Sequence, residues 1–283
     1  MYKPKLSVGV QLGDAEKTEL IKGLKDAGID TLEVAACEVC SATRAEQDEY
    51  FEKTERRLDA FRDLGFNLNS FHMTFGPLFC YFNFNDEQRA EAVRRSIDIC
   101  KRVSGYGFKY IVTHTNGWDF PVGGDREKGL SNLIDSYRKL VKESPVRIAA
   151  EVLPRNCLGN TSKEMLYILG KVDGLKTVID LNHIMKEKES DCVLALRDYL
   201  VGLHVSDRDE TNERHWLPGE GIVDFMSVIA ALEKIGYDKV FNYEVRKYLP
   251  HEVMENKKTL FDAYNGALIP ERGLGSYVSD ERF

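Results

Sequence analysis

Histidines recur at the ends of predicted strands in this chain of 283 residues, and five of its six histidines follow this rule. Three acidic residues end buried-looking strands in the same way, although strand interiors normally exclude carboxylates. Imidazoles and carboxylates that arrive together from many separate strands are the ligands of a zinc, manganese or iron site. The sequence is therefore interpreted first as that of a metalloenzyme. The residues concerned are His72, His114, His183, His204, His215, Glu151, Asp180 and Glu244.

The elements that must position these residues alternate between strand and helix. Eight short β-rich runs are separated by segments with helical periodicity, several of which close on Gly. Strict alternation implies parallel strands joined by right-handed crossovers, and eight units in about 250 residues are typical of a (β/α)8 barrel of the α/β class. The predicted strands are residues 6–12, 31–36, 66–72, 109–114, 147–152, 176–180, 201–206 and 239–245.

A doubly wound open sheet is the structural alternative. Against it, the first strand is followed by QLGDAEK and not by the GxGxxG turn of a dinucleotide-binding fold. No linker, low-complexity stretch or charge block divides the chain, so we expect one domain over residues 1–283. The tail from about residue 269 to 283 is expected to be an irregular extension on the surface or against a neighbouring subunit.

The charge and hydrophobicity of the chain argue against nucleic acid and membranes as binding partners. The formal net charge of -7 disfavours nucleic acid, which would have to be held by a local basic patch. The N-terminus MYKPKLSVGV lacks the pattern of a signal peptide, and no apolar run approaches the roughly 20 residues of a membrane span. We therefore expect a soluble, cytoplasmic protein without a membrane partner.

The six cysteines are too sparse and irregular for a disulfide framework, and we expect reduced thiols. Cys37 and Cys40 form a single CxxC. A zinc ribbon would need a second such pair, and a redox motif would need the start of a helix behind it. We assign this motif no chemistry.

Four of the strand-end residues close the last four predicted strands, which are consecutive around a barrel. Barrel enzymes place their chemistry at the carboxyl ends of the strands, so the four side chains should converge. Three carboxylates and one imidazole suit Mn²⁺ or Zn²⁺, with Mg²⁺ or Co²⁺ as further options, and leave positions open for substrate oxygens. The four are Glu151, Asp180, His204 and Glu244.

Each of these residues also has a purely structural interpretation. A single strand-end histidine is commonly a hydrogen-bonded structural residue, and Asp180 is placed to cap the helix that follows its strand. Ion pairs are the alternative for the glutamates, Glu151 with Arg147 or Arg155 and Glu244 with Arg246. Taken together, these interpretations require eight independent coincidences at one face of a barrel, and we favour the metal site.

Three motifs, IDLNH, LHVSDRD and RHWLPGEGIVDF, make the chain resemble the xylose isomerase-like barrels. This superfamily contains sugar and sugar-phosphate isomerases and epimerases, and also endonuclease IV. The resemblance covers nearly the whole chain. Similarity to the ketose 3-epimerases implies that Glu151, Asp180, His204 and Glu244 hold one divalent metal. It also implies that the two glutamates act as acid and base on opposite faces of the substrate, and that His183 contacts a substrate oxygen.

The same residues resemble the three-zinc site of endonuclease IV, which implies additional metal ligands. His72, His114, His183 and His215 then bind substrate or further metals. One position departs from the nuclease pattern, because Glu213 stands where the nuclease has Asp. The longer carboxylate puts the third metal in doubt, and the Arg-rich DNA-contacting loops of the nuclease are not found.

The loops around the predicted barrel mouth suit a small polar substrate. Trp118, Trp216 and the aromatic loop HMTFGPLFCYFNFND offer faces on which a sugar could pack. The alternatives for this loop are a local mini-core or a subunit contact, and the loop and tail together favour a homodimer. Weaker candidates to hold a phosphate or carboxylate are Arg155, Arg208 and Arg246. Glu33 also faces the mouth by position.

The leading hypothesis is a divalent-metal-dependent sugar or sugar-phosphate isomerase or epimerase, catalytic through Glu151 and Glu244. Proton abstraction beside a carbonyl would give an enediolate intermediate. The alternatives are an endonuclease IV-like zinc phosphodiesterase acting on abasic DNA, a lyase similar to inosose dehydratase, and a non-catalytic sugar-binding barrel.

Overall fold

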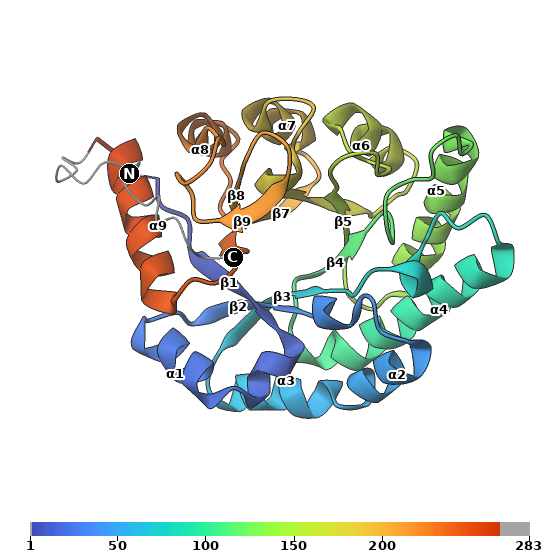
Figure 1. The fold of residues 1–283 in the computed structure, drawn as a ribbon, viewed down its shortest axis with the longest axis horizontal. Helices are drawn as coiled ribbons and strands as arrows, with labels where there is room; N and C mark the ends of the chain where they lie inside the picture. Colours follow the sequence, from blue (N-terminus) through green and yellow to red (C-terminus); the bar gives the residue numbers. More distant parts are fainter. Residues whose placement is uncertain (1, 267–283) are drawn as a thin grey trace.

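The computed structural model describes residues 2–266, and their core is a closed barrel of eight parallel strands surrounded by helices (Figure 1). The predicted (β/α)8 architecture is confirmed. Neighbouring strands around the barrel follow the order β1, β2, β3, β4, β5, β6, β7 and β10 before the barrel closes on β1. Their bounds are Leu6–Gln11, Thr31–Ala35, Asn67–His72, Tyr110–His114, Ile148–Val152, Lys176–Asp180, Leu200–Val205 and Phe241–Tyr243.

Nine α-helices follow the barrel strands within the described residues, and two of them, α2 and α3, lie between β2 and β3. Polar residues cap several helices: the Thr43 side chain accepts from the Glu46 amide, and Asn85, Asp125, Thr161 and Asp224 cap their own helices. The helices are α1 (Thr18–Asp26), α2 (Arg44–Glu52), α3 (Thr54–Asp63), α4 (Asp86–Val103), α5 (Arg126–Glu143), α6 (Ser162–Leu169), α7 (Glu189–Leu196), α8 (Phe225–Lys234) and α9 (Pro250–Tyr264).

Strand alternation carries the strand-end residues into the barrel. Successive side chains of a strand point to opposite faces, so residues two apart share a face. Tyr110, Val112, Ala149, Val178 and Val201 form one buried apolar cluster. His114, Glu151 and Asp180 lie two residues beyond Val112, Ala149 and Val178 on the same strands. The polar strand ends therefore lie in the layer directly above this apolar plug, at the carboxyl end of the barrel.

A short antiparallel ribbon follows β7 and was not predicted from the sequence. It pairs β8 (Asp207–Arg208) with β9 (Glu213–Trp216). Asp207 is fully buried, and its carboxylate accepts hydrogen bonds from the amides of Gly219, Gly221 and Val223 at 2.8–3.1 Å. The carboxylate of Asp207 thus holds the loop PGEGIV next to the ribbon.

Some expectations fall outside these residues. The irregular tail at about residues 269–283 lies beyond the described part, and the single-domain boundary of 1–283 stays a prediction. None of the helices within residues 2–266 is long and apolar enough to cross a membrane. All six cysteines are free thiols in the described structure.

Candidate metal and active site

Four side chains from consecutive strands converge at the carboxyl end of the barrel. One ligand atom from each of Glu151, Asp180, His204 and Glu244 lies within 4.8 Å of the others. Nδ1 of His204 is 3.3 Å from Oε1 of Glu151 and 2.9 Å from Oε2 of Glu244. The two glutamates thus reach the same imidazole nitrogen from different strands. We call these four residues the acidic group.

The acidic group has the charge and the unpaired atoms of a cation site. Glu151 and Asp180 are almost completely buried, and buried carboxylates are costly unless a cation compensates them. Among residues 2–266, Oδ2 of Asp180, Nε2 of His204 and Oε2 of Glu244 are buried without a hydrogen-bond partner. Close approaches such as the 2.9 Å between His204 and Glu244 lack hydrogen-bond geometry. This donor set fits a divalent metal.

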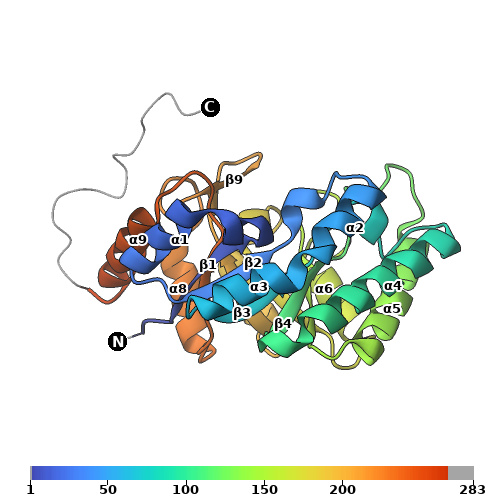
Figure 2. The same ribbon diagram turned by 90° about the horizontal axis from the view of Figure 1, so that it is seen from below.

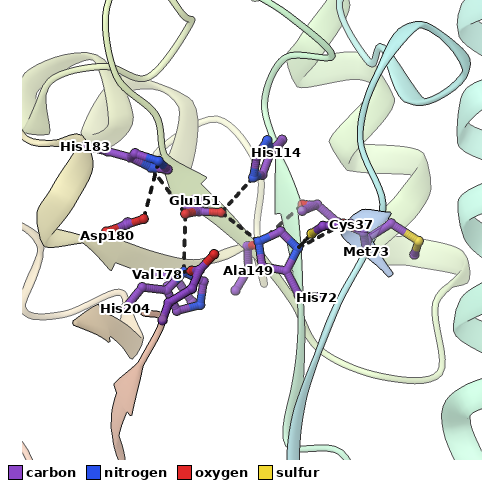
Figure 3. A network of polar contacts seen from close by, with 12 residues as sticks. Cys37, His72, Met73, His114, Ala149, Glu151, Val178, Asp180, His183 and His204 are labelled. Carbon is purple, nitrogen blue, oxygen red and sulfur yellow. Dashed lines mark hydrogen bonds and ion pairs between the residues drawn. The ribbon is translucent and has the colours of Figure 1, made fainter. Parts of the chain in front are cut away.

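A second group lies beside the first and shares Glu151 with it. Oε2 of Glu151 is 3.1 Å from Nε2 of His72 and 3.0 Å from Nε2 of His114. The three ligand atoms lie within 4.8 Å of one another, close enough to hold an ion. Figure 3 shows Glu151 at the centre, between the imidazoles of both groups. We call His72, His114 and Glu151 the imidazole group.

Backbone carbonyls fix the orientation of three histidines. Nδ1 of His72 donates to Met73 O at 2.9 Å, Nδ1 of His183 to Val152 O at 3.2 Å, and Nδ1 of His215 to Glu244 O at 3.0 Å. A neutral imidazole that donates through Nδ1 carries its lone pair on Nε2. Such hydrogen bonds are the usual outer support of a metal-binding histidine.

Two opposing effects set the pKa values of the site residues: burial disfavours their charged forms, and nearby opposite charges favour them. Burial raises the pKa of Asp180 to about 6. Burial alone would lower the pKa of His183, but the charges of Asp180 and Glu151 outweigh it and raise that pKa to about 9. Burial would raise the pKa of Glu151, yet the imidazoles of His114 and His204 hold it well below its usual range. In the absence of metal, the site therefore favours an ionised Glu151 beside a protonated His183, whereas burial lowers the pKa of His114.

Glu33 supports the acidic group from below. Its Oε1 lies 2.9 Å from Nε2 of His204, while Ser70 Oγ donates to Oε2 at 2.6 Å and Asn242 Nδ2 to Oε1 at 3.2 Å. The position of Glu33 facing the mouth was expected from the sequence. Its contact with His204 was not.

Two motif residues hold the loop above the site. Asn182 Oδ1 accepts from the Arg214 amide at 3.1 Å, which ties β9 to the loop after β6. Asp180 does accept from the Asn182 amide at 2.8 Å, so the predicted cap exists, but only its Oδ1 is used. The motif IDLNH thus stabilises the turn after β6 and also contributes Asp180 to the acidic group.

The ion pairs with arginine that were considered as the alternative for the two glutamates are not formed, so that alternative is wrong. Arg155 lies 3.1 Å from Asp119 and also pairs with Glu213, not with Glu151. Arg246 is exposed and forms no ion pair with any of residues 2–266, while Glu244 contacts His204 instead. Arg147 likewise has no ion pair in this part of the chain.

Several predicted substrate residues are engaged elsewhere. Arg208 pairs with Glu189 at 2.9 Å and donates to Ile184 O, a buried structural contact. Glu213 is drawn to Arg155, so it does not join His183 and His215 in a compact third group. Trp216 is half-buried beneath the guanidinium of Arg214.

The aromatic loop after β3 divides into two parts. Phe79, Tyr81 and Phe82 are buried in a local core, as the mini-core alternative predicted. Phe75 instead stacks on His114 with ring centroids 4.3 Å apart and meets Trp118 edge-on at 6.0 Å. Trp118 is 51% exposed, so its ring offers an aromatic face to solvent.

Sequence reasoning missed Cys37. Its Sγ lies 3.3 Å from Nδ1 of His72, and burial raises the pKa of the thiol (Figure 3). Cys37 lies two residues beyond the last residue of β2, close to a strand end like the site histidines, and this position was the signal that could have identified it. The contact joins the CxxC motif to the imidazole group.

Comparison with known proteins agrees with the barrel fold. Residues 21–262 match the sequence profile of the xylose isomerase-like TIM barrel family. The chain belongs to this family. The family resemblance inferred from IDLNH, LHVSDRD and RHWLPGEGIVDF is thereby confirmed.

Solved structures with the same fold have low sequence identity to this chain. A D-tagatose 3-epimerase-like protein is 21% identical with a TM-score of 0.76, covering 92% of this chain and 98% of that one. D-psicose 3-epimerase from Clostridium cellulolyticum H10 is 22% identical with a TM-score of 0.67, covering 94% and 93%. At such identities the likeness shows the fold.

Curated relatives match only in part. An uncharacterised protein of Methanocaldococcus jannaschii is 27% identical over 158 residues, 54% of this chain. The matched region spans 60% of that relative and 39% of a second one from the same organism.

Proposed function

We propose that the protein is a metal-dependent epimerase or isomerase of a sugar, working by proton abstraction next to a carbonyl. The observation that carries the proposal is the pair of glutamates that both approach Nδ1 of His204, each with an oxygen within 3.3 Å of that nitrogen. Two carboxylates around one centre supply an acid and a base for one carbon. The names of the structural neighbours, D-tagatose 3-epimerase-like protein and D-psicose 3-epimerase, support this reaction class.

In this proposal the two glutamates bind the metal and also transfer the proton. Glu151, Asp180, His204 and Glu244 would hold a divalent ion, with Mn²⁺ or Zn²⁺ as first choices. Such an ion polarises a carbonyl and acidifies the neighbouring C–H. Glu244, with 31% of its side chain exposed, faces the mouth, whereas Glu151 is buried behind it. One carboxylate takes the proton and the other returns a proton to the opposite face.

The remaining site residues orient the substrate. Nε2 of His183 is held in the site by the hydrogen bond from its Nδ1 to Val152, and it would contact a substrate hydroxyl. Phe75 and Trp118 would pack on the apolar face of the sugar and exclude water. His72, His114 and His215 bind substrate oxygens or a further ion.

The charges at the mouth favour an unphosphorylated sugar. Arg155 is already neutralised by Asp119 and Glu213, and Arg208 by Glu189. A phosphate would have to displace these carboxylates, which costs their ion pairs. Arg246 is the remaining exposed candidate.

Exchange of solvent deuterium tests the mechanism. The metal-loaded protein is incubated in D₂O with D-tagatose, D-psicose, D-fructose and L-ribulose, and products are analysed by NMR. We expect deuterium at the carbon that changes configuration. In Glu244→Gln, one epimer should exchange its C–H through Glu151 without net epimerisation, provided that metal content is retained. Conversion that leaves no deuterium at carbon contradicts proton abstraction.

A metal-dependent phosphodiesterase is the second candidate, and the imidazole group is the observation that favours it, because it provides ligands for a second ion. Elemental analysis discriminates between the two. Two or three zinc ions per chain together with cleavage of abasic DNA would support the phosphodiesterase, and one ion with no cleavage supports the epimerase.

A further inference from the structure

A cavity lined by charged residues lies at the amino-terminal end of the barrel strands, opposite the candidate active site. It has a volume of about 330 Å³ and is formed where β1 and β2 begin. Residues before β1, the turn before β2 and the inner face of α9 surround it. Figure 2 shows the N-terminus at the bottom of the molecule and β9 at its top, with α9 alongside the barrel. The charged residues of its lining are Lys3, Lys5, Asp30 and Lys257.

Lys257 is the unusual member of this lining. It is only 9% exposed, although it carries an ammonium group. Among residues 2–266 it forms no ion pair and no hydrogen bond, and Nζ lies 5.7 Å from the ring centroid of Phe261. The stem of the side chain is buried, whereas Nζ reaches the accessible surface of the cavity without a partner among these residues.

The neighbours of Lys257 increase the positive charge. Lys5 and Asp30 lie 3.1 Å apart and neutralise each other. Lys3 and Lys257 are then left without a carboxylate in the described structure, so the cavity carries two uncompensated positive charges. Burial and, next, the charge of Lys3 lower the pKa of Lys257. Two neighbouring ammonium groups repel each other, and an anion bound between them would remove that repulsion.

We propose that this cavity binds the phosphate group of a small molecule. Two uncompensated ammonium groups match the charge of a phosphate dianion, and lysine is a common phosphate ligand. The volume is at the lower end of the range for small-molecule sites. The six residues of β1 place the cavity roughly 15 Å from the acidic group, so the phosphate site is separate from the candidate active site.

Calorimetric titration of the full-length protein as purified tests the proposal. Inorganic phosphate and fructose 6-phosphate are titrated separately at constant ionic strength. We expect saturable binding, weakened about tenfold or more in Lys257→Met, as for the loss of one hydrogen bond to a charged group. Lys258→Met is the matched control, since Lys258 lies next along α9, is exposed and pairs with Asp262. It should bind as the wild type does.

A second measurement localises the anion. Amine acetylation followed by mass spectrometry should show that phosphate protects Lys257 and leaves Lys258 unprotected. Lys3→Gln, an exposed substitution that spares the core, should also weaken binding if Lys257→Met fails to fold. Equal affinity for the two ligands identifies a site for free phosphate, and tighter binding of fructose 6-phosphate identifies a metabolite site. Unchanged affinity in both lysine variants, or no saturable binding at all, overturns the proposal.

Discussion

The two halves of the candidate site differ in ligand type and in surroundings. The acidic group offers three carboxylates and one imidazole, and three of its atoms are buried without hydrogen-bond partners in the described structure. The imidazole group offers two imidazoles and one carboxylate. His72 and His114 there contact the shared Glu151 directly, with stacking by Phe75 and a thiol from Cys37.

This difference indicates which half needs a cation. Hydrogen bonds and ion pairs already satisfy much of the imidazole group, so it is stable without an ion. The acidic group concentrates negative charge that its single imidazole, His204, cannot balance. We infer that the acidic group binds the tighter ion, and that the imidazole group binds a weaker one or the substrate.

Removal of the shared residue should have the largest effect. Glu151→Gln removes the negative charge from both groups, and we expect catalytic turnover to fall about 10⁴-fold, at the upper end for loss of a general acid or base. Metal content should fall as well. Glu213→Gln, which changes a carboxylate at the mouth outside both groups, is the control. A variant Glu151→Gln that keeps full activity would break the proposed mechanism.

The two halves can be separated by matched histidine substitutions. His204→Asn removes a ligand of the acidic group, and we expect metal affinity to fall more than about hundredfold, beyond the loss typical of outer-shell changes. His72→Asn should leave the tight ion in place and lower activity by about tenfold or less. Equilibrium dialysis with elemental analysis measures both. If His72→Asn loses the tight ion and His204→Asn keeps it, the ranking of the two halves is wrong.

The metal-free protein should lose stability in mildly alkaline solution. The pKa of His183 is raised to about 9, above its value of about 6.5 in the unfolded chain, so its contribution is complete below pH 6.5 and is lost as pH rises through 9. Asp180, with a pKa of about 6, is mostly ionised at pH 6.5 and completes its ionisation early in this window, so His183 dominates the change towards pH 9. A bound metal ion would compensate the carboxylates in place of the proton on His183, so the free energy of unfolding should then no longer depend on pH in this range.

Urea unfolding at pH 6.5 and pH 9, with chelator or with added metal, measures this difference. We expect a loss of order 1–3 kcal/mol with chelator and little change with metal. His183→Asn should flatten the profile of the metal-free protein. Parallel profiles with and without metal would show that His183 is not coupled to the metal site.

The smallest effect is expected at the ion pair above the site. Arg155→Gln breaks the contacts with Glu213 and Asp119, which are half-exposed, and should lower the free energy of unfolding by less than about 1 kcal/mol. Turnover of an unphosphorylated sugar should change little. A large loss of turnover would bring Arg155 back as a substrate ligand.

Much of the site could be predicted from the sequence because it depends on local order. A strand places alternate residues on one face, so His114, Glu151 and Asp180 could be assigned to the barrel interior from their position two residues beyond an apolar one. Strand ends are short-range features of the chain. The eight predicted strands therefore overlap the eight observed ones, and the strand-end residues meet at one face.

Distances between strands were decided only by the tertiary structure. The register around the barrel brings Glu151 between His72, His114 and His204, and no local pattern states that one carboxylate is shared by both groups. Long side chains such as Arg155 choose partners across loops whose paths the sequence leaves open, which is why its pairing with Glu213 was missed.

The sequence by itself thus determined a barrel with imidazoles and carboxylates at one end. The closed sheet decided how they divide into an acidic and an imidazole group, and the packing of α9 decided that Lys257 is buried. The physical reason is that side chains alternate between the two faces of a strand, so the local sequence determines towards which face each one points. The distance between side chains of different strands depends on how distant segments of the chain pack.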